Sequence, residues 1–254
     1  MIPNPWDAGS ARLLTSLGFE ALATTSAGFA WTLGRLDGTV TLDEKLEHCR
    51  ALCQATDLPV SADLENGFVD APEDVADTIR RAAETGLVGG SIEDFTGNDD
   101  DPIYELAHAV ERVQAAAEAA ERLPTPFLLT ARAENLLHDR PDLDDTIRRL
   151  QAFEQAGAHV LYAPGLRSLE EVRLVTSSVV RPVNVLGPMV QGATVAELAD
   201  AGAKRISVGG ALARAALGGA LRAAAALREG RFEWVEQAAP GEEIRRLLIP
   251  WLDD

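Results

Sequence analysis

Short apolar runs alternate with longer amphipathic stretches along the whole chain. The runs are rich in Ala, Val, Leu and Ile without strict polar alternation, which is typical of strands covered on both faces. The expected strands are residues 2–6, 20–26, 59–65, 89–95, 126–134, 159–165, 182–188 and 205–209. The expected helices are residues 8–17, 42–55, 72–85, 103–123, 143–156, 169–177, 195–201 and 212–228. The alternation predicts eight parallel βαβ units.

Local signals mark where several of these helices begin and end. The expected N-caps, whose side chains satisfy free backbone N–H groups, are Asp7, Thr41, Asp142 and Thr194. The expected C-caps are Gly18, Gly86, Gly157 and Gly202, each between a helical run and a strand.

Chain length favours a closed barrel. Eight units within 254 residues predict a single α/β domain over residues 1–254, a parallel (β/α)8 TIM barrel. An open doubly wound sheet is the alternative, because alternation alone does not prove closure. Residues 241–254 add a C-terminal helical segment whose apolar residues are expected to pack on the barrel's own helices or on another subunit.

Charge limits the possible partners. Forty acidic and 23 basic side chains give a net charge of -17, which disfavours nucleic acid and anionic membranes as partners. An anionic substrate would therefore need a metal ion, an arginine or backbone N–H groups. No apolar run approaches the ~20 residues of a membrane span, and no leader pattern opens the sequence. Cys49 and Cys53, four residues apart on one helix face, are expected to be a reduced pair, which favours a cytoplasmic location.

Acidic residues gather at the expected carboxyl ends of two strands, where barrel enzymes build their sites. Asp63 and Glu65 lie two apart and so share a strand face, and Glu93 ends the next strand. Such crowded acids repel one another unless they are protonated, paired with Arg132 or neutralised by a cation. We therefore predict an Mg²⁺ site, with Mn²⁺ as a substitute, at Asp63, Glu65 and Glu93. The alternative is that these acids are simply solvated.

Other polar groups at the strand ends are candidates for binding an anionic substrate. Arg132 suits a bidentate grip on a carboxylate or phosphonate, and its alternative role is a structural salt bridge with Glu134 or Glu93. The turn Thr25, Ser26, Ala27, Gly28 offers backbone N–H groups to an anion.

The four histidines contribute little to the expected site. His48 and His108 are expected to be solvated on helices, and His159 opens a strand at the end away from the site. Only His138, in the loop after Arg132, is placed to reach the mouth of the barrel, the opening at the carboxyl ends of the strands, as a general acid or base.

The sequence resembles the isocitrate lyase and phosphoenolpyruvate mutase superfamily over nearly the whole chain, and several of these segments carry the resemblance. The matching segments are Asn4 to Ala11 with Thr24 to Gly28, Ala62 to Phe68, Ile92 to Asp94, and Thr130 to Arg132. The resemblance implies an Mg²⁺-bound enolate formed from a 2-oxo or 2-hydroxy acid, with Arg132, Asp37 and Glu93 as catalytic residues. It also implies substrate contacts from Thr25, Ser26, Ala27, Asp63, Arg132 and Asn184, and a homotetramer that exchanges C-terminal helices.

One loop departs from the family pattern. The carbon-carbon lyases usually carry a lysine, cysteine, glycine and histidine sequence after the fourth strand, but residues 94–103 contain no Cys, Lys or His. The phosphonate mutases' lysine and asparagine pattern is matched only by Asn98. The sequence thus predicts a magnesium-dependent lyase of small 2-oxo or 2-hydroxy di-acids. The alternatives are a mutase or hydrolase of phosphonopyruvate-type substrates and a 2-oxo acid binding barrel without catalysis.

Overall fold

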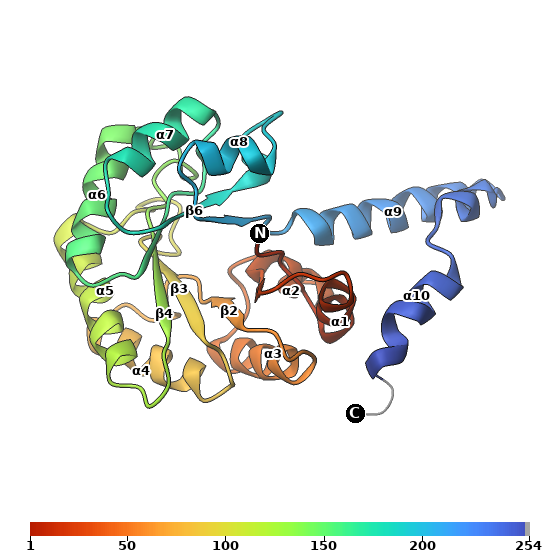
Figure 1. The fold of residues 1–254 in the computed structure, drawn as a ribbon, viewed down its shortest axis with the longest axis horizontal. Helices are drawn as coiled ribbons and strands as arrows, with labels where there is room; N and C mark the ends of the chain where they lie inside the picture. The colour runs from red at the N-terminus through yellow and green to blue at the C-terminus, as the bar shows by residue number, and fades with distance from the viewer. Residues whose placement is uncertain (252–254) are drawn as a thin grey trace.

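Seven parallel strands form a nearly closed barrel in the computed structural model, which describes residues 1–251 (Figure 1). The strands are β1 (Leu22–Ala23), β2 (Val60–Asp63), β3 (Gly89–Glu93), β4 (Leu128–Arg132), β5 (Val160–Tyr162), β6 (Val183–Leu186) and β7 (Arg205–Ser207). They pair in sequence order from β1 to β7. A doubly wound sheet reverses its strand order partway, so the prediction of a barrel is confirmed.

The expected first strand is reduced to a short bridge. Ile2 pairs in parallel with Ser207 of β7, and the backbone N–H of Ala23 in β1 donates to the Pro3 carbonyl at 3.0 Å. Residues 2–3 therefore lie between β7 and β1 and nearly close the barrel. The prediction of a strand over residues 2–6 was wrong, because Pro3 and Pro5 have no N–H to donate to a ladder.

Within residues 1–251, ten α-helices accompany the strands, and most of them cover the outside of the barrel (Figure 1). They are α1 (Ala8–Ser16), α2 (Ser26–Thr32), α3 (Leu42–Gln54), α4 (Pro72–Ala83), α5 (Leu106–Glu121), α6 (Leu143–Gln155), α7 (Leu169–Ser177), α8 (Val195–Asp200), α9 (Ala211–Arg228) and α10 (Gly241–Leu248). Short 3₁₀ helices cover Gly187–Met189, Glu233–Gln237 and Ile249–Trp251. All four predicted N-caps accept a backbone hydrogen bond, and all four predicted C-cap glycines have positive φ.

Helix α2 replaces the turn expected over residues 25–28. Thr25 caps it by accepting the Gly28 N–H at 3.2 Å. A side chain at Gly28 would place its Cβ 2.5 Å from Thr25 Cγ2 and 3.0 Å from Trp6 Cβ. Glycine is therefore required where the helix starts against its own cap and the N-terminal segment.

The two faces of the strands differ in chemistry. Apolar residues that pack under the helices include Val60, Ile92, Leu129, Leu161, Val185 and Ile206. The residues that alternate with them point into the barrel and are largely polar: Ser61, Ser91, Thr130, Tyr162, Asn184, Arg205 and Ser207. Since TIM barrels usually fill this space with branched apolar side chains, the polar interior sets this barrel apart.

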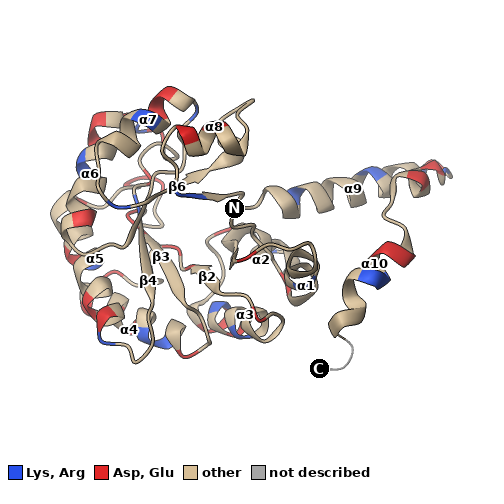
Figure 2. Ribbon diagram, in the orientation of Figure 1, with Lys and Arg blue, Asp and Glu red and all other residues tan. Residues whose placement is uncertain are grey.

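The C-terminal segment leaves the barrel as an arm (Figure 1). Helix α9 projects outward, and α10 turns back to pack on α1 of the same chain, where Ser16 Oγ donates to the Leu247 carbonyl at 2.6 Å. Figure 2 shows few charged residues along α9, and its exposed apolar residues include Leu221, at 71% exposure. Residues 252–254 of the predicted segment lie outside the described residues. Within residues 1–251, no helix has the length and apolar character needed to cross a membrane.

Candidate active site

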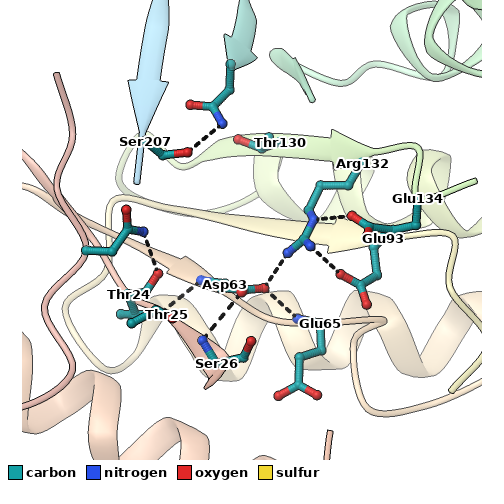
Figure 3. Close-up of polar contacts among 12 residues, drawn as sticks. Thr24, Thr25, Ser26, Asp63, Glu65, Glu93, Thr130, Arg132, Glu134 and Ser207 are labelled. Carbon is teal, nitrogen blue, oxygen red and sulfur yellow. Dashed lines mark hydrogen bonds and ion pairs between the residues drawn. The ribbon is translucent and has the colours of Figure 1, made fainter. Parts of the chain in front are cut away.

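Arg132, at the end of β4, lies at the centre of a carboxylate cluster (Figure 3). Its Nε donates to Glu134 at 2.7 Å, its Nη1 to Asp63 at 2.7 Å, and its Nη2 contacts Glu93 at 3.0 Å. The register of the sheet brings Asp63 and Glu93 close to Arg132, because β2, β3 and β4 are neighbouring strands and Glu93 is directly paired with Arg132. The salt bridges to Glu93 and Glu134 that the sequence left as an alternative are both formed.

Asp63 is held by the elements on both sides of it. Its Oδ1 accepts the Glu65 N–H at 3.2 Å, and its Oδ2 lies 3.5 Å from the Ser26 nitrogen at the start of α2. Behind it, the fully buried Lys45 of α3 donates to Thr24 Oγ1 at 3.1 Å. Burial opposes ionisation, but Arg132 and Lys45 outweigh it and hold the pKa of Asp63 below its ordinary value.

The other two predicted metal ligands, Glu65 and Glu93, have raised pKa values because they are buried among other negative charges. Burial and the charge of Asp63 raise the pKa of Glu65 to about 7. Burial and the charges of Glu134 and Asp63 also raise the pKa of Glu93 well above its ordinary value, although Arg132 acts against them. A single arginine therefore does not neutralise this group of acids.

A hard divalent cation fits these donors. Carboxylate oxygens are preferred ligands of Mg²⁺, which usually keeps several waters beside one or two protein carboxylates. Within residues 1–251, no three Asp, Glu, His or Cys side chains converge as a ready-made ligand set. Asp63 and Glu93 already contact Arg132, and the Glu65 carboxylate points away from that cluster (Figure 3). The metal role of Asp63, Glu65 and Glu93 stays a prediction.

Two cavities meet at Asp37. One, of about 200 Å³, reaches into the barrel and is lined by Asp63, Arg132 and Asn184 among others. The other, of about 550 Å³, opens over the acids Glu65 and Glu93. Although Asp37 as a residue is exposed, surrounding protein atoms and the charge of Asp63 raise the pKa of its carboxyl. Asp37 thus borders both the acidic mouth and the interior cavity.

The remaining predicted substrate contacts also face the interior cavity. Thr25, Ser26 and Ala27 line it from the first turn of α2. Asn184 lies deeper, where its Nδ2 donates to Ser207 Oγ at 3.0 Å. The structure therefore brings all of the predicted substrate-binding residues to one cavity.

Two histidines, His48 and His138, lie differently from what the sequence predicted. His48 is buried rather than solvated, because it shares the inward face of α3 with Lys45 and Cys49. Its Nε2 lies 2.9 Å from the Trp6 carbonyl, and burial together with Lys45 lowers its pKa to about 3. His138 stacks on Phe95, with ring centroids 3.9 Å apart, and lines neither of the two cavities.

The loop after β3, which departs from the family pattern, is short and held by its own hydrogen bonds. Phe95 bridges Ile103, and Thr96 Oγ1 donates to the Asp101 carbonyl at 2.7 Å. Asn98 Oδ1 accepts the Asp100 N–H at 3.1 Å, so this side chain caps its own turn. The loop offers the site carboxylates and backbone groups but no thiol, amine or imidazole.

Three residues of the site were missed by the sequence analysis. They are Lys45 behind Asp63, Tyr162, whose ring lies 5.3 Å from the Arg132 guanidinium, and Arg205 in the barrel interior. A signal for Arg205 exists in the sequence. Arg205 and Ser207 flank Ile206, so both point to the same face of the strand. Two polar residues on one face are unexpected in a strand that is covered on both faces.

Comparison with known proteins places these features in context. A family model described as phosphoenolpyruvate phosphomutase matches residues 1–228. A crystal structure from Burkholderia cenocepacia J2315, provisionally named a lyase/mutase, is 58% identical, covers 96% of this chain and 88% of its own, and has a TM-score of 0.92. Phosphonopyruvate hydrolase in complex with oxalate and Mg²⁺ is 22% identical, with 98% and 89% coverage and a TM-score of 0.85, a likeness of fold.

Two curated relatives are enzymes that act on small acids. The 2-methylisocitrate lyase of Escherichia coli is 29% identical over 70% of this chain and 61% of the relative. The oxaloacetate decarboxylase of Bradyrhizobium diazoefficiens is 31% identical over 72% of this chain and 64% of the relative. The matched region spans less than two thirds of either relative.

Proposed function

Because the chain belongs to the phosphoenolpyruvate phosphomutase family, we propose that it is a magnesium-dependent lyase of small 2-oxo or 2-hydroxy di-acids that acts through an enolate. The observation that carries the proposal is that Arg132 has N–H donors left over for a substrate. A guanidinium has five N–H donors, and Arg132 uses two of them in hydrogen bonds to Glu134 and Asp63, while its Nη2 lies 3.0 Å from Glu93. One N–H on each terminal nitrogen remains to grip an anionic substrate at the edge of the interior cavity.

The proposed step for a 2-oxo di-acid breaks the bond between the third carbon and its carboxylate. Carbon dioxide leaves, and the electron pair moves into the bond between the second and third carbons to give an enolate, which a proton then quenches. When bound, Mg²⁺ would act as a Lewis acid that stabilises the developing negative charge. Asp63, Glu65 and Glu93 are the residues that would hold it.

The other side chains would orient the substrate and move protons. Arg132 and the backbone N–H groups of Ser26 and Ala27 would fix the carboxylate next to the reacting carbon. With a 2-hydroxy di-acid, Asp37, whose pKa is raised, would accept the hydroxyl proton while the bond between the second and third carbons breaks. The second carbon would leave as a 2-oxo acid, and the electron pair would stay on the third carbon as the enolate of its carboxylate until a proton quenches it. Asn184 would contact the substrate from the inner wall of the cavity.

The loop after β3 supports a substrate that needs no protein thiol. With no Cys, Lys or His in residues 94–103, the enolate carbon would receive its proton from water or a carboxyl group. Decarboxylation of an oxaloacetate-like acid meets this condition, and one relative is an oxaloacetate decarboxylase. The family description and the fold of phosphonopyruvate hydrolase favour carbon-phosphorus chemistry as the second candidate.

A turnover panel tests the proposal. The purified protein is given oxaloacetate, 2-methylisocitrate and phosphonopyruvate, each with Mg²⁺ and with chelator, and both the substrate consumed and the pyruvate released are measured. We expect Mg²⁺-dependent release from oxaloacetate or 2-methylisocitrate, and a loss of about 100-fold or more in Asp63→Asn because the metal and Arg132 both lose a partner. Asp57→Asn, at an exposed aspartate, is the matched control.

The other outcomes separate the alternatives. Consumption of phosphonopyruvate alone would replace the lyase with a carbon-phosphorus mutase or hydrolase. A protein that binds 2-oxo acids with Mg²⁺ but consumes none of the panel would be a binding barrel.

The arm supports a second part of the proposal, assembly into a homotetramer through the C-terminal helices. Several large apolar side chains on α9 and the segment after it are exposed, among them Leu221 at 71% and Phe232 at 67%, and a cluster of this kind is typical of an interface between proteins. Substituting both with Asp should lower the mass measured by light scattering, and so should deletion of residues 241–254. An unchanged mass in both variants would contradict the tetramer.

A further inference from the structure

Arg205, at the start of β7, extends into the barrel rather than toward solvent. Its Nε donates to Asn184 Oδ1 at 2.9 Å, and its Nη2 donates to Thr130 Oγ1 at 3.0 Å. Both partners are neutral, and both lie on strands that face the same interior. The side chain is therefore fixed in place by hydrogen bonds that do not neutralise its charge.

No carboxylate of residues 1–251 compensates Arg205. Within those residues no Asp or Glu oxygen lies within 4.0 Å of its guanidinium, whereas Arg132 has three such partners. Burial, with a smaller contribution from the charge of Arg132, lowers the pKa of Arg205 to about 10, although Tyr162 acts in the opposite direction. A buried cation is costly unless an anion pairs with it.

Space for such an anion exists next to Arg205. The residue lines the interior cavity of about 200 Å³ together with Ser91, Tyr162, Asn184 and Ser207. Arg205 Nη1 has no hydrogen-bond acceptor within residues 1–251, and this atom is accessible to solvent rather than fully buried. The same cavity extends to Asp63 and Arg132, so one ligand can span both arginines.

We propose that Arg205, with Asn184 and Ser207, forms an anion subsite inside the barrel that holds the far acid group of a di-acid ligand. The inference rests on the proposed function, because it places the reacting end of the ligand at Arg132 and the acidic mouth. It makes Arg205 a residue that determines specificity: the protein selects di-acids over the mono-acids that lack the far carboxylate. The polar interior then serves recognition, in a space that other barrels fill with apolar side chains.

The test compares two ligands that differ by one carboxylate. Succinate and propionate are titrated calorimetrically, in chelator, into wild type, Arg205→Gln, Arg205→Lys and the exposed control Arg173→Gln. Wild type and control should bind succinate about tenfold more tightly than propionate, the effect of one charge-assisted contact. Arg205→Gln should bring the two affinities within about twofold.

Arg205→Lys keeps the charge but has no planar fork to reach Asn184 and the ligand together, so it should lie between these values. If Arg205→Gln does not fold, as judged by circular dichroism, Arg205→Lys decides alone. The inference is overturned if wild type has no preference for succinate, or if both Arg205 variants keep the wild-type preference.

Pyruvate titrations with and without Mg²⁺ separate this inference from the proposed function. Pyruvate has a single carboxylate, so its Mg²⁺-dependent binding should survive in Arg205→Gln. Pyruvate binding that ignores Mg²⁺ in wild type would remove the proposed mechanism, while an Arg205-dependent preference for succinate would still stand.

Discussion

Arg132 and Arg205 are two arginines in one barrel with opposite surroundings. Arg132, at the mouth, contacts three carboxylates from neighbouring strand ends. Arg205, deeper in the same cavity, contacts only an amide and a hydroxyl within the described chain. The mouth therefore carries excess negative charge and the interior excess positive charge. A cation at one end and an anion at the other would satisfy both.

His48 shows a third way to bury a basic group. It lies on α3 against Phe29, with ring centroids 3.8 Å apart, and its lowered pKa keeps it neutral. The charge is paired in Arg132, unpaired in Arg205 and absent in His48, so substitutions of these residues should change stability by different amounts.

The largest effect is expected for Arg132→Met. Removing this guanidinium leaves Asp63, Glu93 and Glu134 with little compensation in a buried cluster. We expect a loss of about 3–5 kcal/mol in the free energy of unfolding, measured by urea denaturation at pH 7. A loss below about 1 kcal/mol would show that the acids are protonated or solvated instead of paired.

A smaller effect, dependent on pH, is expected at His48. Its folded pKa of about 3 lies below the ordinary 6.5, so its contribution to stability is complete above pH 6.5 and is lost as the pH falls toward 3. At pH 5 the loss amounts to roughly 2 kcal/mol. His48→Gln should remove this part of the pH dependence, while the half-buried His108→Gln should not. Equal pH dependence in wild type and His48→Gln would contradict a neutral His48.

The smallest effect on stability is expected for Arg205→Met. The variant leaves Asn184 and Thr130 short of a donor but also removes an uncompensated charge, and these effects oppose each other. The free energy of unfolding without ligand should change by less than about 1.5 kcal/mol. A loss as large as that of Arg132→Met would mean that Arg205 supports the fold itself.

The sequence predicted the barrel and the polar strand ends because both depend on local patterns. Helix caps such as Thr41 and Asp142 were recognisable from neighbouring residues, and Asp63, Glu93 and Arg132 followed from the rule that barrel sites lie at strand ends. The first strand was expected from its apolar residues, but the missing N–H groups of Pro3 and Pro5 reduced it to a bridge.

The features that the sequence did not predict depend on how distant segments come together. The short run at Arg205 does not show which way its side chain points until six other strands define an interior. The burial of Lys45 and His48 depends on the face that α3 turns toward the barrel. The pairing of Arg132 with three acids depends on the register of β2, β3 and β4.

We propose that the mouth of the barrel binds Mg²⁺ together with a 2-oxo acid. The most direct test is calorimetric titration with pyruvate, oxaloacetate and 2-oxoglutarate, each with Mg²⁺ and with chelator, in wild type and Asp63→Ala. We expect binding that requires the metal and is lost in Asp63→Ala. Binding that is indifferent to both the metal and Asp63 would contradict it.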